Sequence, residues 1–161
     1  NGITGSAMDS YLTMRGMRTL GVRIQRQQDT TAELVDFLMS HSGVDHVNYP
    51  GLPDHPGHEI ATRQQHGYGP MFSFELSGGE EAVREFVANL ELFSLAESLG
   101  GVESLIAHPA TMTHAAVDPE GQKRAGIKIN LLRISPGMED PQDLINDLGR
   151  ALSFAQKAAA A

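Results

Sequence analysis

The segment Leu92–Thr113 reads LFSLAESLGGVESLIAHPATMT, and the later segment Leu131–Asp140 reads LLRISPGMED. In the first segment, residues 93–97 are a candidate strand, and residues 104–107 are a candidate for a second, short strand. Between them, Ser-Leu-Gly-Gly at residues 98–101 predicts a break, because paired glycines favour turns. The later segment predicts a strand that ends before Pro-Gly.

Outward from these segments, hydrophobic periodicity predicts further strands and helices. The additional strands are expected at residues 44–49, 71–76 and 129–134. Helices are expected at residues 7–41 and 58–65, after Gly78-Gly79, and from Pro141 onward. The tail from Lys157 to Ala161 is expected to fray. A loop or short helix is expected at residues 118–125. Interleaved helices and strands predict a mixed α/β (α+β-like) fold with about four strands in a small, mostly antiparallel sheet and helices on one face.

The amino-terminal region is predicted to be one long helix or two helices in tandem. Ser6 and Asp9 have the spacing of a helix N-cap followed by an acidic residue at the third helical position. Gly16 and Gly21 weaken the helix locally, so a bend is expected between them. We expect a single domain over residues 1–161, in which residues 1–41 are a linking helical region and residues 42–161 the sheet-and-helix body.

Composition excludes several classes of function. The net charge of −8 argues against a nucleic-acid partner, because a surface that follows phosphates needs clustered Lys and Arg. The chain has no cysteine, so it forms neither disulfides nor thiolate metal sites. No segment approaches the length of a membrane span, and the start NGITGSAMDS lacks the features of a signal peptide. A cytoplasmic protein without a membrane partner is expected, and the missing initiator Met is typical of an internal fragment.

Both opening segments, with TGSAMDSYLTMRGMRTL at residues 4–20 and the region 49–79, resemble the carboxy-terminal domain of the Cys/Met metabolism enzymes that use pyridoxal phosphate (PLP). These enzymes have PLP fold type I. The resemblance covers essentially the whole chain, in the order and at the spacing of the family. Within the family, the sequence most resembles bacterial cystathionine γ-synthases. PLP is therefore the cofactor that the resemblance implies for the intact enzyme, and small amino acids are the implied substrates.

The resemblance also implies roles for two residues at the predicted strand ends. Arg133, in LLRIS, matches the arginine that binds the α-carboxylate of the substrate. A guanidinium suits this role because it is planar, permanently charged and able to bind a carboxylate through two hydrogen bonds. Ser98, in ESLGG, matches the catalytic serine that lies beside the PLP lysine and helps to hold its amine. Considered alone, Arg133 would be interpreted as an ion-pairing arginine and Ser98 as a turn residue.

Three further residues complete the predicted site. Glu97 matches a glutamate of the cystathionine-handling relatives, where a carboxylate can meet the ammonium of the second amino acid. Leu99 matches a residue whose backbone lies near the substrate carboxylate. Thr113 matches a threonine on a loop that lines the site, although its hydroxyl could equally satisfy local backbone.

PLP chemistry requires a lysine that forms a Schiff base with the cofactor. The chain contains Lys123, Lys128 and Lys157, and none lies in the family's lysine context. The PLP-lysine domain is thus expected to be absent from this chain, which alone is predicted to be inactive. The resemblance further implies that the intact enzyme is a homotetramer in which this domain contacts the large PLP domain.

The implied reaction joins O-succinylhomoserine and cysteine into cystathionine and succinate, in methionine biosynthesis. Cystathionine γ-lyase and homoserine sulfhydrylase share the same motifs and stay open as alternatives. A free-standing, non-catalytic binding module is the alternative from a different class. A metal site at His55 and His58 is not expected, because the loop offers no third ligand nearby in the sequence.

Overall fold

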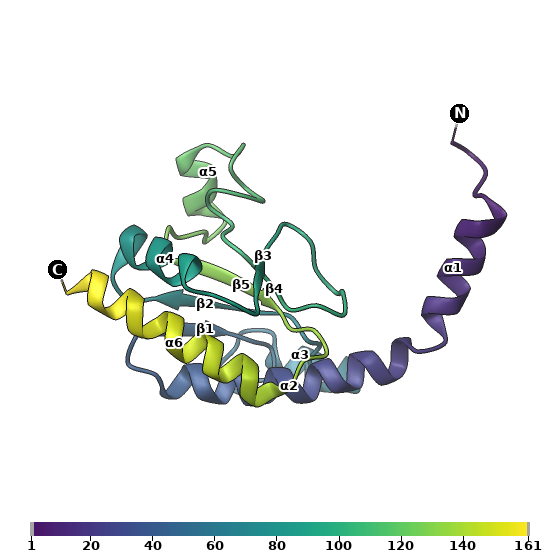
Figure 1. The fold of residues 1–161 in the computed structure, drawn as a ribbon, viewed down its shortest axis with the longest axis horizontal. Coiled ribbons are helices and arrows are strands. Elements are labelled where there is room, and N and C mark those ends of the chain that lie inside the picture. The colour runs from purple at the N-terminus through teal and green to yellow at the C-terminus, as the bar shows by residue number, and fades with distance from the viewer. Residues whose placement is uncertain (1, 161) are drawn as a thin grey trace.

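The computed structural model describes residues 2–160, which form one five-stranded sheet and six helices (Figure 1). The strands are β1 Val44–Asn48, β2 Phe72–Leu76, β3 Ser94–Leu95, β4 Leu105–Ala107 and β5 Leu131–Ser135. The helices are α1 Ala7–Met17, α2 Leu20–Ser40, α3 His58–Gln64, α4 Gly79–Ala88, α5 Pro119–Arg124 and α6 Pro141–Ala159. The expected mixed α/β class is confirmed.

The amino-terminal region consists of two helices in tandem, with the break between the two glycines that predicted it. The hydroxyl of Ser6 accepts a hydrogen bond from the backbone N–H of Asp9 (3.0 Å) and caps α1. At the break, Nη2 of Arg23 donates to the carbonyl of Gly16 (2.9 Å), which also accepts from the backbone N–H of Thr19 (3.3 Å). No residue of α1 is buried, and this helix projects away from the rest of the chain (Figure 1).

The sheet has the strand order β1-β2-β5-β4-β3. Every neighbouring pair is antiparallel except β3 and β4, which are parallel, so the sheet is mostly antiparallel as expected. The strand predicted at residues 93–97 is confirmed only for Ser94 and Leu95, which form a short edge strand. The sheet therefore has five strands rather than about four.

Three helices cover one face of the sheet. Figure 1 shows α2 and α6 running side by side along the sheet, and α4 packs against α6. The core between these helices and the sheet is apolar, and its members with no exposed surface include Leu38, Phe74, Phe86, Leu132 and Leu148. Alternation along β2 and β5 produces this core, because every second side chain of a strand points to the same face.

The carboxy-terminal helix differs from the sequence prediction at its end. Asp140 caps α6 through a hydrogen bond from the N–H of Gln142, and Pro141 occupies the first turn as expected. The tail was predicted to fray from Lys157, but α6 continues to Ala159. Alanine has the highest helix propensity, which favours this extension. Residue 161 lies outside the described residues.

A buried carboxylate fastens the segment between α4 and β3 to α6. Asp147 accepts hydrogen bonds from the backbone N–H groups of Glu91 (2.9 Å), Leu92 (2.9 Å) and Phe93 (3.2 Å). Arg150, one turn further along α6, pairs with the same carboxylate and with the side chain of Glu91. The start of β3 is thereby fixed by polar contacts from the far end of the chain.

Candidate functional site

The candidate site lies on the face of the sheet opposite the helices. On β5, Leu132 and Ile134 point into the core, so the alternation of the strand directs Arg133 to the other face. Arg133 lies opposite Ser73 of β2 and Ala107 of β4 in the strand register. A central strand therefore holds this arginine on a rigid part of the fold.

The guanidinium of Arg133 reaches the turn that follows β3. Its Nη2 donates a hydrogen bond to the carbonyl oxygen of Ser98 (3.0 Å). Its Nε is buried and has no hydrogen-bond partner among residues 2–160, and no carboxylate in this part of the chain forms an ion pair with it. A buried donor without an acceptor is costly, so this side chain is suited to an incoming anion.

The conformation and hydrogen bonds of the turn at residues 98–101 hold it beside Arg133. Gly100 adopts a φ of 73°, a left-handed conformation that glycine reaches without strain. Its backbone N–H donates to the hydroxyl of Ser135 at the end of β5 (2.9 Å). The turn is thus tied to β5 at two points, through Arg133 and through Ser135.

The structure brings four of the five predicted site residues together. Glu97, Ser98 and Leu99 are consecutive, exposed residues of the turn that Arg133 contacts. Thr113 is half-buried in the segment that follows β4, where its hydroxyl hydrogen bonds with Nδ1 of His114 (2.8 Å). This contact is with a side chain rather than with the backbone, and it does not link Thr113 to Arg133.

Two residues that hold the turn were missed by the sequence analysis. Gln27 of α2 donates hydrogen bonds to the carbonyls of Gly101 (2.7 Å) and Pro136 (2.9 Å). Ser135, whose hydroxyl accepts from the N–H of Gly100, is the last residue of the recognised LLRIS motif, in which only Arg133 had been given a role. Neither residue had a sequence signal, since a polar residue in a helix or at a strand end is ordinarily solvated.

The lysines of the chain are located away from this turn. Lys128 forms an ion pair with Glu75 (2.7 Å), and Nζ of Lys157 lies 5.2 Å from the centroid of the Phe154 ring. Lys123 is exposed in the last turn of α5. Among the described residues, Arg133 therefore offers N–H donors to a carboxylate, and none of the three lysines hydrogen bonds with Ser98.

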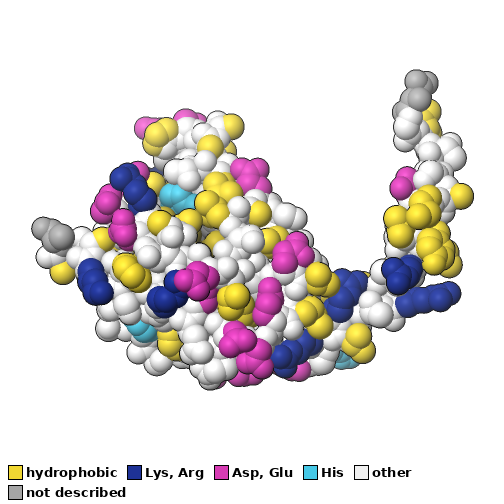
Figure 2. Space-filling model, viewed as in Figure 1, with side chains coloured by type: hydrophobic (Ala, Val, Ile, Leu, Met, Phe, Trp, Pro, Cys, Tyr) yellow, Lys and Arg dark blue, Asp and Glu magenta, His cyan; other side chains and the backbone are white. Residues whose placement is uncertain are grey.

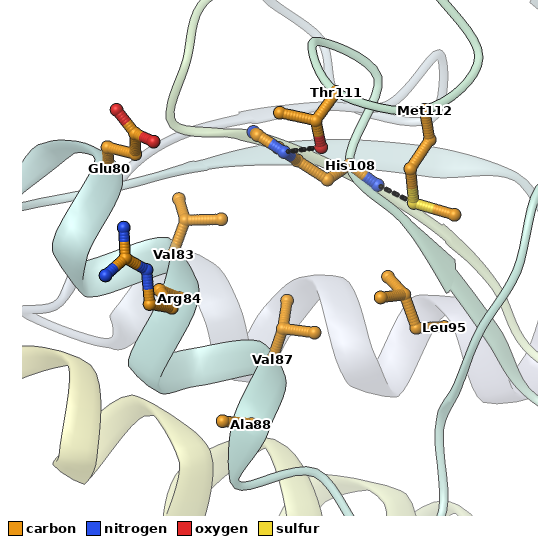
Figure 3. Close-up of a pocket in the computed structure, with 9 residues that line it drawn as sticks. All are labelled: Glu80, Val83, Arg84, Val87, Ala88, Leu95, His108, Thr111 and Met112. Carbon is orange, nitrogen blue, oxygen red and sulfur yellow. Dashed lines mark hydrogen bonds between the residues drawn. The ribbon is translucent and has the colours of Figure 1, made fainter. Parts of the chain in front are cut away.

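A separate apolar groove of about 380 Å³ lies between α4 and residues 108–112 (Figure 3). Val83, Val87 and Leu95 supply much of its apolar wall. His108 lies at its edge, and both ring nitrogens are already engaged, with the hydroxyl of Thr111 (2.7 Å) and the carbonyl of Ile129 (2.6 Å). None of the predicted site residues lines this groove, so we separate it from the site at Arg133.

The histidines that were considered for a metal have other partners. Nδ1 of His55 accepts from the N–H of Gly57 (3.0 Å), and Nδ1 of His58 hydrogen bonds with the carbonyl of Pro50 (2.8 Å). Within residues 2–160, no three His, Cys, Asp or Glu side chains are grouped so that they could hold a metal ion. The same residues contain no helix long and apolar enough to cross a membrane.

Comparison with known proteins identifies the family. The family described as Cys/Met metabolism PLP-dependent enzyme matches residues 1–153. The chain belongs to this family. Its sequence is 53% identical to the cystathionine γ-synthase of Escherichia coli (strain K12) over 156 residues, 97% of this chain and 40% of that protein. It is also 47% identical to a cystathionine γ-lyase of Dictyostelium discoideum over 94% of this chain and 39% of that protein.

Solved structures confirm the fold. The cystathionine γ-synthase of Xanthomonas oryzae pv. oryzae, in complex with cystathionine, matches with a TM-score of 0.93 and 54% identity. The match covers 98% of this chain and 41% of that chain. Our chain thus spans about two-fifths of the length of the relatives that it matches. The family implies PLP as the cofactor of the intact enzyme.

Proposed function

We propose that the protein containing this chain is a PLP-dependent cystathionine γ-synthase. It would join O-succinylhomoserine and cysteine, releasing succinate, in methionine biosynthesis. The observation that carries the amino-acid-binding part of the proposal is Arg133, whose buried Nε has no acceptor among residues 2–160 while its Nη2 donates to the carbonyl of Ser98. The high identity to the E. coli synthase supports the choice within the family.

Arg133 would bind the α-carboxylate of the amino-acid substrate. The hydrogen bond to Ser98 uses one of its five N–H donors and fixes the plane of the guanidinium. The remaining N–H groups can then donate to the oxygens of a carboxylate and hold it in a single orientation. Orientation matters because the cofactor, when bound, supplies an electron sink, and the bond that breaks depends on how the substrate is held.

The turn residues would complete the substrate site. The hydroxyl of Ser98 is exposed and can both donate and accept, so it suits a contact with the amine of the cofactor-binding lysine. The backbone of Leu99 would lie beside the substrate carboxylate. The exposed carboxylate of Glu97 would attract the ammonium of the second amino acid. Thr113, in the segment after β4, would line the substrate site of the intact enzyme.

The 161-residue chain alone is predicted to be inactive. Its three lysines are exposed or engaged elsewhere, so the Schiff base must come from the large PLP domain. In the intact protein we propose a cytoplasmic homotetramer in which this domain contacts the large domain. The exposed apolar side chains of α1, seen as yellow spheres along the projecting helix in Figure 2, supply surface for such contacts. They are Met8, Tyr11, Leu12, Met14 and Met17.

A cystathionine γ-lyase is the second candidate function. The cystathionine γ-lyases of Dictyostelium discoideum and Bacillus subtilis are 47% and 49% identical to this chain, close to the 53% identity of the E. coli synthase. All of these reactions need the same carboxylate contact. A homoserine sulfhydrylase would share it as well.

Product analysis of the full-length, PLP-loaded protein distinguishes these functions. We expect cystathionine to form from O-succinylhomoserine and cysteine, faster than cystathionine alone is cleaved. Rapid cleavage of cystathionine with no product from the first pair would replace the synthase by a lyase. Incorporation of sulfide in preference to cysteine would indicate a sulfhydrylase, and no reaction with any pair would support a non-catalytic module.

A further inference from the structure

The turn at residues 98–101 has few apolar contacts that could hold it. Ser98, Leu99 and Gly100 are all exposed, and 55% of the surface of Leu99 is accessible to solvent. Burial of side chains therefore contributes little to the position of this turn. Its geometry depends instead on the hydrogen bonds that tie it to neighbouring elements.

One of these ties comes from α2, outside every motif of the candidate site. Gln27 is 2% exposed, and its Nε2 donates to the carbonyl of Gly101 at 2.7 Å and to that of Pro136 at 2.9 Å. Gly101 ends the turn, and Pro136 follows the strand that carries Arg133. A single amide group thus joins the two segments whose spacing sets the distance between Ser98 and the guanidinium.

We propose that Gln27 is a positioning residue for amino-acid binding, a role that rests on the proposed function of Arg133. Its two hydrogen bonds hold the turn against β5, so that the carbonyl of Ser98 stays in place to orient the guanidinium. Loss of the amide would free the turn at Gly101 and leave the buried carbonyl of Pro136 without this donor. The guanidinium would then bind a carboxylate from a wider set of orientations.

The test replaces Gln27 by Met in the full-length protein. Methionine keeps the length of the side chain and suits a helix, but it cannot donate a hydrogen bond. Gln28→Met is the matched control, because Gln28 is the next residue of α2 and its Oε1 accepts from the N–H of Gly69 (2.9 Å) rather than from the turn. Steady-state kinetics and hydrogen exchange of the peptide spanning residues 97–103 are measured for both variants.

We expect Gln27→Met to raise KM for the first amino-acid substrate by about tenfold with kcat changed by less than about twofold, since the lost contact acts equally on bound substrate and transition state. Exchange of residues 97–103 should accelerate in Gln27→Met and stay at the wild-type rate in Gln28→Met. A merely structural role would lower the melting temperature or the active fraction and leave KM unchanged, and that result would overturn the proposal.

Hydrogen exchange separates this proposal from the proposed function. If the wild-type protein turns over no amino acid, the proposed function fails, and the exchange rate of residues 97–103 alone decides whether Gln27 holds the turn. Equal exchange in wild type and Gln27→Met would contradict the positioning role, whatever the activity of the protein.

Discussion

The two faces of the sheet are held in different ways, and β5 contributes to both. On the helix-covered face, Leu132 and Ile134 have no exposed surface and belong to the same apolar core as residues of α4 and α6. On the opposite face, the Nε of Arg133 is buried without a partner among residues 2–160, and its Nη2 donates a hydrogen bond to the turn. The comparison teaches that the apolar face specifies the fold, while the opposite face keeps polar groups free for a ligand.

The largest effect is expected from a break in the apolar face. Phe74 of β2 has no exposed surface and meets the ring of Phe86 edge-on, with centroids 5.8 Å apart. Phe74→Ala should lower the free energy of unfolding by about 4 kcal/mol, because it removes buried area and leaves a cavity. Urea unfolding of the full-length protein measures this change.

The matched control is Phe154→Ala on α6, where the ring is 39% exposed. Phe154→Ala should lower the free energy of unfolding by less than about 1 kcal/mol, since most surface substitutions have small effects. Equal losses for the two variants would contradict the assignment of the core to the helix-covered face.

Asp147 extends the comparison of the two faces, because its charged side chain is buried on the helix-covered side of the sheet. Burial alone would raise the pKa of its carboxyl, but the backbone N–H groups of residues 91–93 and the guanidinium of Arg150 outweigh burial and hold the pKa below its usual range. A lowered pKa stabilises the fold above the pKa of the unfolded chain, and this contribution is lost as pH falls through the folded value.

Asp147→Asn should therefore lower the free energy of unfolding at pH 7 by about 2 kcal/mol, the range for hydrogen bonds to charged groups. The difference in free energy of unfolding between wild type and Asp147→Asn should narrow in acid, below the usual aspartate pKa of about 4. Asp36→Asn, at an exposed position of α2, is the control and should show no such gap. A gap that is constant from pH 7 to acid would mean that the charge of Asp147 does not contribute.

The fold could be predicted from the sequence wherever periodicity carried the information. The strand predicted at residues 71–76 is found as β2, whose Phe72, Phe74 and Leu76 are buried, and the helix predicted after Gly78-Gly79 is found as α4. The prediction was wrong for residues 93, 96 and 97, which lie outside the short edge strand, for residues 129–130, which precede β5, and for the helical end of the chain. Pairing of β3 depends on a partner strand distant in sequence, so local pattern does not determine its length.

The candidate site was predictable only where a motif named it. The resemblance named Arg133 and residues 97–99, and the structure joins them through the hydrogen bond from Arg133 to the carbonyl of Ser98. Gln27 and Asp147 escaped prediction, because the backbone groups with which their side chains hydrogen bond in the turn and before β3 lie 54 or more residues away along the chain. Hydrogen bonds over such separations have no periodic signature in the sequence.

The central claim is that Arg133 binds the substrate carboxylate, and Arg133→Lys tests it most directly. Lysine keeps the positive charge but loses the planar pair of donors. In the full-length, PLP-loaded protein we predict that kcat/KM for the amino-acid substrate falls about 100-fold or more. The free energy of unfolding should change little, and Arg84→Lys, at an exposed ion pair with Glu81, should leave kcat/KM unchanged. Wild-type kcat/KM in Arg133→Lys would contradict the account.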